Sequence, residues 1–354
     1  MKSVSGENHG VRSEETSLAQ EPNVTSTPVA QQRQQVACIG FWADYEDYFW
    51  TKADPSRFDV HVLNVKDAAR HRPIFKIMPR FGRKYLYNRI IAQQIASQPD
   101  ALFLVNEREE IVEYLHKARP RARIAVVVRN PIATKNGMGP LLQDLHAAGY
   151  PVLSFDEADC QRYGFEPYRQ YIAAVDSVKS VQAVVDFAFL GKDKGRKSLI
   201  EALSSDLRRR GFTTSIRFTE LKKARKTLAD RLAKHTGNSP YPAYLAENLA
   251  ARCIIDIVQD GQQGLTLRPL EATLYGRKLL TNNGSVRVAD FYHPANVFLL
   301  DGNANLDGIE EFFKAPFQPV SPEVMALYSV EALIDRVNIL LNNVGVREES
   351  SPAA

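Results

Sequence analysis

The chain contains 354 residues, which corresponds to two globular domains of about 150 residues each. Apolar residues make up 44%, charged residues 24%, and the net charge is only +4. This composition excludes a disordered polyelectrolyte and gives no overall reason to expect nucleic-acid binding. The three widely spaced cysteines form no C-x-x-C pair, so a disulfide framework and a zinc site are both disfavoured.

A cytoplasmic location is expected from the cysteine usage, because reduced cysteines are typical of that compartment. No apolar run reaches the roughly 20 residues that span a bilayer, and the N-terminus lacks the apolar core of a signal peptide. Both ends of the chain are expected to be disordered tails. Residues 1–34 contain no aromatic side chain, and residues 347–354 are similarly polar, so neither segment can bury enough apolar surface to order itself.

Between the tails, short aliphatic runs alternate with helical patterns. In the first half, strands are predicted at 36–42, 58–65, 101–106, 122–130 and 151–155. Helices are predicted at 86–98, after Asn106 as a capping residue, and from Pro140 onwards. Continuous aliphatic strands separated by helices are typical of a parallel sheet that is covered on both faces.

The second half follows the same plan after a linker near 165–184. Strands are predicted at 184–191, 214–218, 253–259, 278–282 and 296–302, and helices at 195–211, 220–235, 241–251, 266–275 and 328–343. We therefore predict an α/β protein with two Rossmann-like, doubly wound domains facing a cleft. The N-terminal domain is expected at 35–180 and the C-terminal domain at 181–346.

The stretch 261–283 has the features of an anion site. A loop containing Gly264 leads into a helix that starts near Thr266, and the free N–H groups at a helix N-terminus attract anions. Thr266 can cap the helix, and Arg268 can add charge-assisted bonds to a phosphate. Glu271, one turn later, can accept hydrogen bonds from two vicinal sugar hydroxyls. The alternative is an ordinary capped helix with a surface pair between Arg268 and Glu271.

A second candidate anion site lies in the sequence FAFLGKDKGRKSL at 187–199. A predicted strand ends at Gly191 and a helix follows, with Gly195 in the loop between them. Cations on such a strand-to-helix loop form an electropositive nest that suits a diphosphate. The alternative is a solvated basic turn. The cations concerned are Lys192, Lys194 and Arg196.

Gly264, Glu271, Ala272 and Gly276 fall in a pattern that resembles the donor-binding domain of GT-B glycosyltransferases, and the strand and loop at 278–282 continue the match. This resemblance implies that Glu271 binds the ribose of a nucleotide-sugar and that the basic loop holds its diphosphate. It also places Asn282 among the donor-binding residues. Gln263 stands where many retaining members carry a glutamate, so a retaining mechanism that needs this carboxylate is not implied.

Residues 36–345 as a whole resemble bacterial surface-polysaccharide and lipopolysaccharide glycosyltransferase-like proteins, mainly through the two stretches above. The resemblance implies transfer of a sugar from a nucleotide-sugar to a saccharide or lipid-linked acceptor. No cofactor and no metal are expected: no histidine has metal-ligand spacing, and no D-x-D follows a strand. The alternative is a GT-B-like binding or regulatory protein without catalytic activity. A dinucleotide-dependent oxidoreductase is disfavoured, because no G-x-G-x-x-G follows the first strand.

A loop with three acidic residues is expected directly after the first strand. These residues, Asp44, Glu46 and Asp47, are candidates for the general base that activates an acceptor hydroxyl. Ligands bind beyond the carboxyl ends of strands in doubly wound sheets, although acidic loops are also common there. Residues 66–89 contain eight Lys or Arg and a single acid, interleaved with apolar side chains. This segment is expected to contact the anionic inner face of the plasma membrane. The alternatives are that it holds an anionic acceptor or merely flanks a helix.

Overall fold

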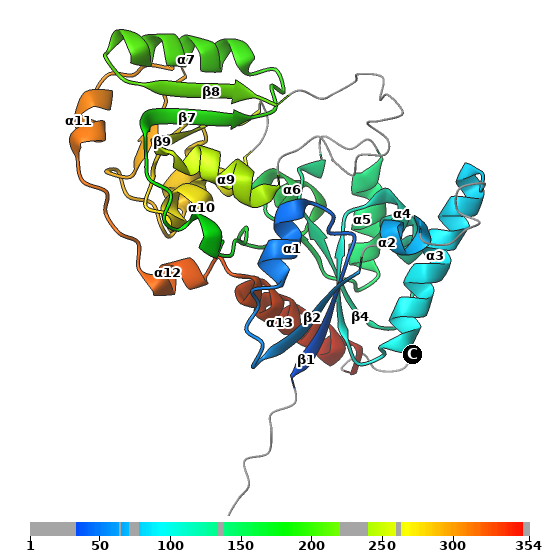
Figure 1. Cartoon of the computed structure of the whole chain (residues 1–354). Helices are drawn as coiled ribbons and strands as arrows, with labels where there is room; N and C mark the ends of the chain where they lie inside the picture. Colours follow the sequence, from blue (N-terminus) through cyan, green and yellow to red (C-terminus); the bar gives the residue numbers. More distant parts are fainter. Residues whose placement is uncertain are drawn as a thin grey trace, which may run out of the picture. The chain divides into compact units, whose positions relative to one another are not determined.

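Two parallel β-sheets organise the chain in this computed structural model (Figure 1). The structure describes residues 33–63, 65–70, 78–132, 137–219, 240–259, 263–302 and 304–349. The first sheet has the strand order β2-β1-β3-β4-β5-β6 and the second the order β11-β10-β9-β7-β8. Every strand pairing in both sheets is parallel, which confirms the predicted α/β fold class with two Rossmann-like domains.

The first sheet consists of β1 (Gln34–Ile39), β2 (Phe58–Leu63), β3 (Leu102–Asn106), β4 (Arg123–Val128), β5 (Val152–Ser154) and β6 (Glu166–Pro167). Its helices are α1 (Asp44–Trp50), α2 (Val65–Arg70), α3 (Arg80–Ser97), α4 (Glu109–Ala118), α5 (Met138–Ala147) and α6 (Glu157–Tyr163). All five residues of β3 are buried, because helices cover both faces of the sheet at its centre.

The second sheet consists of β7 (Val185–Gly191), β8 (Thr214–Phe218), β9 (Ala251–Asp256), β10 (Lys278–Thr281) and β11 (Val297–Leu299). Its helices include α7 (Lys197–Arg209), α9 (Tyr241–Leu249), α10 (Leu267–Leu274) and α11 (Ile309–Lys314). Two further helices, α12 (Pro322–Ala326) and α13 (Val330–Glu349), close the described part of the chain. The predicted helix at 220–235 lies outside the described residues.

The two strand orders place one topological switch point in each sheet. In the first sheet the order reverses between β1 and β3, and in the second between β7 and β9. Doubly wound sheets bind ligands just beyond the carboxyl ends of the strands at this point. The residues that follow β1, β3, β7 and β9 are therefore the places to search for a site.

Alternate residues along the strands divide the core into three clusters. Ala37 and Ile39 belong to a cluster on one face of the first sheet, and Cys253 and Ile255 to a cluster on one face of the second. The third cluster combines side chains of the opposite faces of both sheets, Cys38 and Ile254 among them. The two sheets therefore share this third cluster, which joins them through one hydrophobic core.

Two local predictions were wrong, and one helix makes contacts that were not expected. The acidic segment after β1 is helix α1 instead of a loop, because its apolar residues Phe49 and Trp50 are fully buried. Asn106 does not cap α4, whose N-cap is Arg108 without a side-chain cap. Helix α13, which we assigned to the C-terminal domain, contacts β4 of the first sheet, and Asn338 on it bonds to Gln34 of β1 at 2.9 Å.

The described part of the chain extends into both of the expected tails, 1–34 and 347–354. Residues 1–32 lie outside the described residues, whereas Gln34, at the end of the expected tail 1–34, pairs with Phe58 in the first sheet. At the other end, α13 continues to Glu349 and so extends into the expected tail 347–354. Among the described helices, none has the length and apolar character needed to cross a membrane.

Candidate functional site

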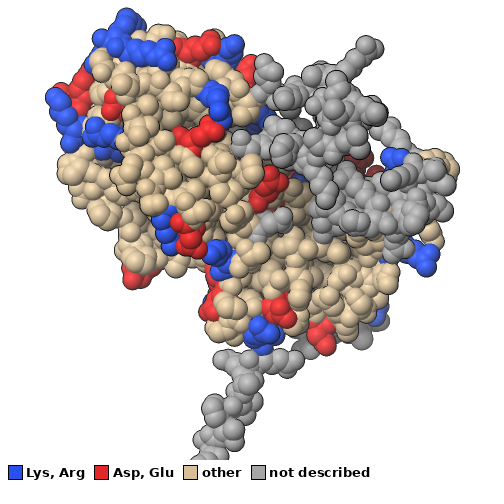
Figure 2. All heavy atoms as spheres, in the orientation of Figure 1, with Lys and Arg blue, Asp and Glu red and all other residues tan. Residues whose placement is uncertain are grey.

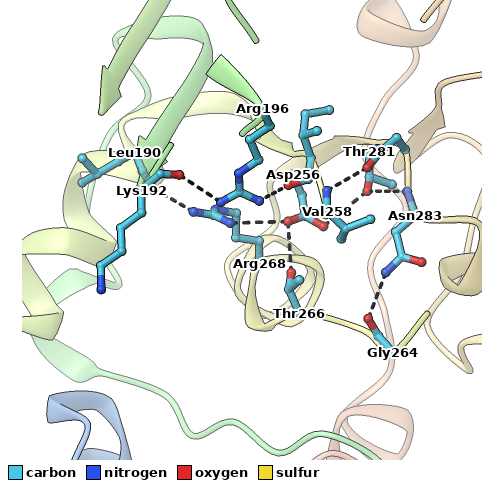
Figure 3. A network of polar contacts seen from close by, with 12 residues as sticks. Leu190, Lys192, Arg196, Asp256, Val258, Gly264, Thr266, Arg268, Thr281 and Asn283 are labelled. Carbon is cyan, nitrogen blue, oxygen red and sulfur yellow. Dashed lines mark hydrogen bonds and ion pairs between the residues drawn. The ribbon is translucent and has the colours of Figure 1, made fainter. Parts of the chain in front are cut away.

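A cluster of charged side chains lies beyond the carboxyl ends of β7 and β9, at the switch point of the second sheet (Figure 3). Asp256, the last residue of β9, is fully buried. It accepts hydrogen bonds from Thr266 at 3.0 Å and Thr281 at 3.3 Å, and it lies 3.5 Å from Nη1 of Arg268. A buried carboxylate requires such partners, so Asp256 fixes the residues that surround it.

Arg268 is held over the end of β7. Its Nη2 donates to the carbonyl of Leu190 at 2.9 Å and to the hydroxyl of Tyr244 at 3.1 Å. Its guanidinium carbon lies 5.1 Å from the centre of the Phe189 ring, within the range of a cation–π interaction. A Cβ atom on Gly191 would lie 2.5 Å from Nη2 of Arg268, so a larger residue at position 191 would displace this guanidinium.

Arg196 and Lys194 add further positive charge to the same place. Arg196 donates to the carbonyls of Ile257 and Lys192, and its guanidinium lies 5.3 Å from the same Phe189 ring. Burial and the nearby charge of Arg268 lower the pKa of Arg196. Burial, Arg196, Lys192 and Arg268 lower the pKa of Lys194. These cations repel one another, and a bound anion would relieve the repulsion.

Some of the positive charge in the second half of the chain is exposed and some is buried. Figure 2 shows Lys and Arg side chains over α7, at the top of the view, with Asp and Glu side chains between them. Among the cations of the switch point, Arg268 is only 9% exposed and Arg196 is half-buried, whereas Lys192 and Lys194 are exposed. Burial strengthens the interaction of the two guanidinium groups with an anion, because the local dielectric is lower than that of water.

The hydrogen bonds at the N-termini of α7 and α10 differ from those predicted from the sequence. Asp193 accepts a hydrogen bond from the N–H of Lys197 at 2.9 Å, so the basic loop itself supplies an acceptor at the start of α7. Lys194 and Gly195 both have positive φ, at 51° and 81°. Thr266 is the N-cap residue of α10, but its hydroxyl binds Asp256 and makes no cap, contrary to the prediction.

The loop of Gly264 is also occupied, by a side chain of the other half of the chain. The N–H groups of Gln263 and Gly264 donate to Oδ2 of Asp156 at 3.2 and 2.9 Å. A Cβ atom on Gly264 would lie 2.5 Å from the Phe155 ring and 2.9 Å from the Phe155 carbonyl oxygen. Glycine is therefore required here by the close approach of segment 155–156.

Glu271 is only 1% exposed, and Arg268 is buried too, so the alternative of a surface pair between them is wrong. Its Oε1 accepts a hydrogen bond from the hydroxyl of Tyr241 at 2.9 Å. Its Oε2 is buried without a hydrogen-bond partner among the described residues. Burial raises the pKa of this carboxyl, and the charge of Arg268 lowers it. Asn282, directly after β10, accepts a hydrogen bond from the N–H of Val258 at 2.8 Å and so joins the loops after β9 and β10.

The three acidic candidates of the first half lie in α1 and differ in environment. Asp44 is exposed, whereas nothing is described of the Asp47 side chain. Glu46 is 2% exposed, lies 3.5 Å from Nε of Arg129 and accepts from the N–H of Ala43 at 3.0 Å. Burial is the largest influence on Glu46 and raises the pKa of its carboxyl. Glu46 therefore forms a buried ion pair and does not face solvent.

Two charged residues near Glu46, Arg129 and Glu107, were not among the predicted site residues. Arg129, directly after β4, is buried and donates to Oε1 of Gln170, and its guanidinium lies 4.1 Å from the centre of the Tyr171 ring. Glu107, directly after β3, accepts from the N–H of Arg129 at 2.9 Å. Charged residues directly after two aliphatic strands were the available signal, since ligand sites lie there.

A pocket of about 200 Å³ lies between segments of the two halves. Aromatic rings of Phe155, Tyr168 and Tyr328 form part of its wall. Arg169 and Asp290 line it as an ion pair at 2.8 Å, one from each half of the chain. Further polar residues complete the lining, among them Glu157, Gln170, Gln263 and Ser285.

Two other expectations concern a metal site and the basic segment 66–89. Among the described residues, no three His, Cys, Asp or Glu side chains gather as metal ligands. Residues 71–77 and the side chains of Lys66, Arg70 and Arg80 lie outside the description. In the described part of the segment, Phe81 and Tyr85 on α3 are 79% and 67% exposed.

No protein-family model matches the chain, and no curated protein matches its sequence. Similar solved structures include accessory secretory protein 1, 2 and 3 in Streptococcus pneumoniae, with a TM-score of 0.39 and 10% identity over 74% of this chain. The match spans 57% of that chain. The glycotransferase of kitacinnamycin has a TM-score of 0.41 and 9% identity, and the match covers 91% of this chain and all of that chain. LpCGTa in complex with UDP has a TM-score of 0.38 and 12% identity, and the match covers 91% of this chain and 96% of that chain. With TM-scores this low, the fold class rests on the strand orders of the chain itself: two Rossmann-like α/β domains.

Proposed function

We propose that this protein is a glycosyltransferase that binds a nucleotide-sugar donor at the switch point of its second sheet. The observation that carries the proposal is the group of crowded cations beyond β7 and β9. Lys192, Lys194, Arg196 and Arg268 lie close enough to perturb one another, and the nearby acids Asp193, Asp256 and Glu271 offset only part of their charge. A nucleoside diphosphate supplies the missing negative charge.

The same cations suit the chemistry of sugar transfer. When the bond between the anomeric carbon and the β-phosphate oxygen breaks, negative charge increases on the leaving diphosphate. Guanidinium and ammonium groups that are already in place stabilise this charge without reorganising. Arg268 is fixed by Asp256 and Leu190, and Arg196 by Ile257 and Lys192, so both are preorganised. We propose that the reaction needs no metal, because these cations take its role at the diphosphate.

Glu271 supports a nucleotide as the carrier of the diphosphate. One oxygen of its carboxylate is held by Tyr241, and the other is buried without a hydrogen-bond partner among the described residues. Burying an unpaired carboxylate oxygen is costly unless a ligand completes its bonding. We propose that the vicinal hydroxyls of the ribose do so.

For the acceptor we propose the pocket between the two halves. Arg129 only donates hydrogen bonds, so the Gln170 atom that it contacts is the amide oxygen, and the NH2 group of Gln170 remains as a donor for other partners. Aromatic rings beside such amide groups suit a hydroxyl-rich ligand such as a saccharide, free or lipid-linked. Asp44 is the exposed acid among the described candidates for the general base.

The experiment that tests this function is an incubation of the purified protein with UDP-, GDP-, CMP- and dTDP-sugars, with and without EDTA. Slow release of the free sugar in EDTA from one class of donor is the expected result. Binding of a nucleotide-sugar without hydrolysis or transfer would favour the inactive binding protein, which the glutamine at position 263 suggests. Activity that EDTA abolishes and Mg²⁺ restores would contradict the metal-free scheme. A role in bacterial surface-polysaccharide or lipopolysaccharide synthesis is tested by offering such saccharides as acceptors.

The described part of segment 66–89 supports a peripheral membrane contact as an addition to this function. Phe81 and Tyr85 lie one turn apart on α3 and expose their rings, in a segment with eight cations and one acid. Exposed aromatic rings among cations are typical of surfaces that bind anionic lipid. Vesicles with 30% phosphatidylglycerol should sediment the protein, and the F81S/Y85S variant should remain in the supernatant. Equal sedimentation of both proteins would contradict this contact.

A further inference from the structure

A single carboxylate ties together two loops that are more than a hundred residues apart in the sequence. Oδ2 of Asp156 accepts the N–H groups of Gln263 and Gly264, and Oδ1 accepts those of Ala158 and Asp159 at 3.1 and 3.4 Å. The first pair belongs to the loop before α10, and the second pair to the first turn of α6. Asp156 is 1% exposed, so this contact is closed to solvent.

The loop before α10 is built to present these two N–H groups. The carbonyl of Gln263 accepts from the hydroxyl of Ser285, and the carbonyl of Gly264 accepts from the amide of Asn283 at 3.1 Å. The carbonyl of Gln263 and the N–H of Gly264 belong to the same peptide unit and point in opposite directions, so the bond to Ser285 directs this N–H toward Asp156. The N–H of Gln263 donates to the same oxygen of Asp156. Adjacent backbone N–H groups held in this way form a small anion-binding nest. In this structure an anion of the chain itself, the Asp156 carboxylate, fills the nest.

We propose that Asp156 is an internal competitor of the donor diphosphate at this loop and a latch between the two sheets. This inference rests on the proposed function, because the competing ligand is the diphosphate. When a diphosphate takes the N–H groups of Gln263 and Gly264, Oδ2 of Asp156 loses both of its donors. Oδ1 keeps its bonds to α6, so the helix remains capped while the connection between the two sheets is released.

The latch has a measurable consequence for affinity. A ligand that must first displace Asp156 binds with an apparent affinity reduced by the fraction of molecules in which the latch is open. The Asp156→Asn variant retains an oxygen that caps α6 but places an NH2 group against the two N–H donors. This variant should therefore bind diphosphates more tightly than the wild type, by about ten-fold. The Asp156→Ser variant, which also keeps a capping oxygen, provides a second test if the first variant folds poorly.

Asp159 offers a matched control on the same helix. It is also a buried acid, and it accepts the N–H of Ile132 at 2.9 Å without contacting the loop before α10. The Asp159→Asn variant removes the same carboxylate chemistry and should leave diphosphate affinity within two-fold of the wild type.

The experiment is a calorimetric titration of the full chain and these variants with pyrophosphate and with UDP. The latch is supported when D156N or D156S binds both ligands about ten-fold more tightly and D159N binds them as the wild type does. Unchanged or weaker binding by D156N and D156S, with measurable binding to the wild type, would overturn the latch and leave the donor site intact. If neither ligand binds any of the proteins, the donor site itself is wrong, and the latch falls with it.

Discussion

Nη1 of Arg268 lies 3.5 Å from Oδ1 of Asp256, an acid with no exposed surface, at the end of a buried strand. The pair joins α10 to β9, and Thr266 and Thr281 complete the bonding of the carboxylate. Asp256 thus positions Arg268, which in our proposal contacts the donor.

This pair should be important for stability. Removal of one partner of a buried ion pair leaves an uncompensated charge, so the Asp256→Asn variant should lower the free energy of unfolding by about 3 kcal/mol. Urea unfolding followed by circular dichroism measures this loss. The Glu201→Gln variant is the control, because it removes the exposed pair between Lys197 and Glu201, for which a change below about 1 kcal/mol is expected. An equally small loss in D256N would show that Asp256 contributes no more than a surface acid.

Anion binding should depend on pH through Lys194. Its pKa is lowered from the ordinary value of 10.5 by burial and by neighbouring cations, so it loses its proton at a lower pH than in the unfolded chain. Its positive charge is present below this lowered pKa and is lost as the pH rises through it. Sulfate affinity of the wild type should therefore fall on the alkaline side, at pH values below 10.5.

The Lys194→Met variant should bind sulfate more weakly at pH 7, with a flatter alkaline profile. Lys179, an exposed lysine paired with Asp176, provides the control variant Lys179→Met, which should follow the wild type. Titration calorimetry across pH 7–10 gives both profiles. Identical profiles for K194M and the wild type would place Lys194 outside the anion site.

The ionised carboxylate of Glu271 should lower the stability of the fold. Burial raises its pKa above the ordinary value of 4.5, so the folded state binds more protons than the unfolded state just above that pH. Stability of the wild type should then fall as the pH rises from 4.5 through the raised pKa, and the Glu271→Gln variant should lack this loss. At pH 7, E271Q should be at least as stable as the wild type.

The same variant should bind UDP about ten- to a hundred-fold more weakly, because one charge-assisted hydrogen bond to the ribose is lost, at roughly 1.5–3 kcal/mol. Unfolding curves and calorimetry on E271Q separate the two effects. A variant with lower stability and unchanged UDP affinity would assign Glu271 to the support of Tyr241 alone.

The limit of the N-terminal tail can be tested by truncation. Gln34 and Gln35 pair with Phe58 and Asp59 in the first sheet, and Gln34 also bonds to Asn338. A chain that starts at residue 33 should melt within about a degree of the full chain. A chain that starts at residue 36 should melt several degrees lower, because a loss of about 1 kcal/mol shifts Tm by a few degrees. Equal melting temperatures for the two truncated chains would contradict the role of these β1 residues.

Most of the strands were predictable from the sequence, because buried parallel strands are continuous aliphatic runs. The run TSIRF coincides with β8, and ALFLVN contains all of β3. Helix α1 was not predictable in this way, since DYEDYFW has acids where a helix pattern expects a regular apolar stripe. Its conformation depends on burial of Phe49 and Trp50 in the shared core, which is a tertiary effect.

The site was predictable in part, for a similar reason. The cations of the basic loop and Arg268 could be found, because the loop directly follows a strand and Arg268 lies in the first turn of the helix predicted at 266–275. Asp156 and Tyr241 could not be found, since they reach the site from segments 107 and 30 residues away from their partners. Asp256 was overlooked although a signal existed: an acid inside the aliphatic run CIIDIV requires a buried partner.

The central claim is that the cations beyond β7 and β9 hold the diphosphate of a nucleotide donor. A calorimetric titration with UDP, GDP, CDP and dTDP, and with the matching nucleosides, tests it most directly on the wild type and on the Arg196→Ala and Arg196→Lys variants. At least one diphosphate should bind, its nucleoside should not, and R196A should bind at least ten-fold more weakly. R196K should recover part of the loss, because lysine restores the charge without the two-pronged guanidinium. Equal affinity of R196A and the wild type, or no binding of any diphosphate, would contradict the account.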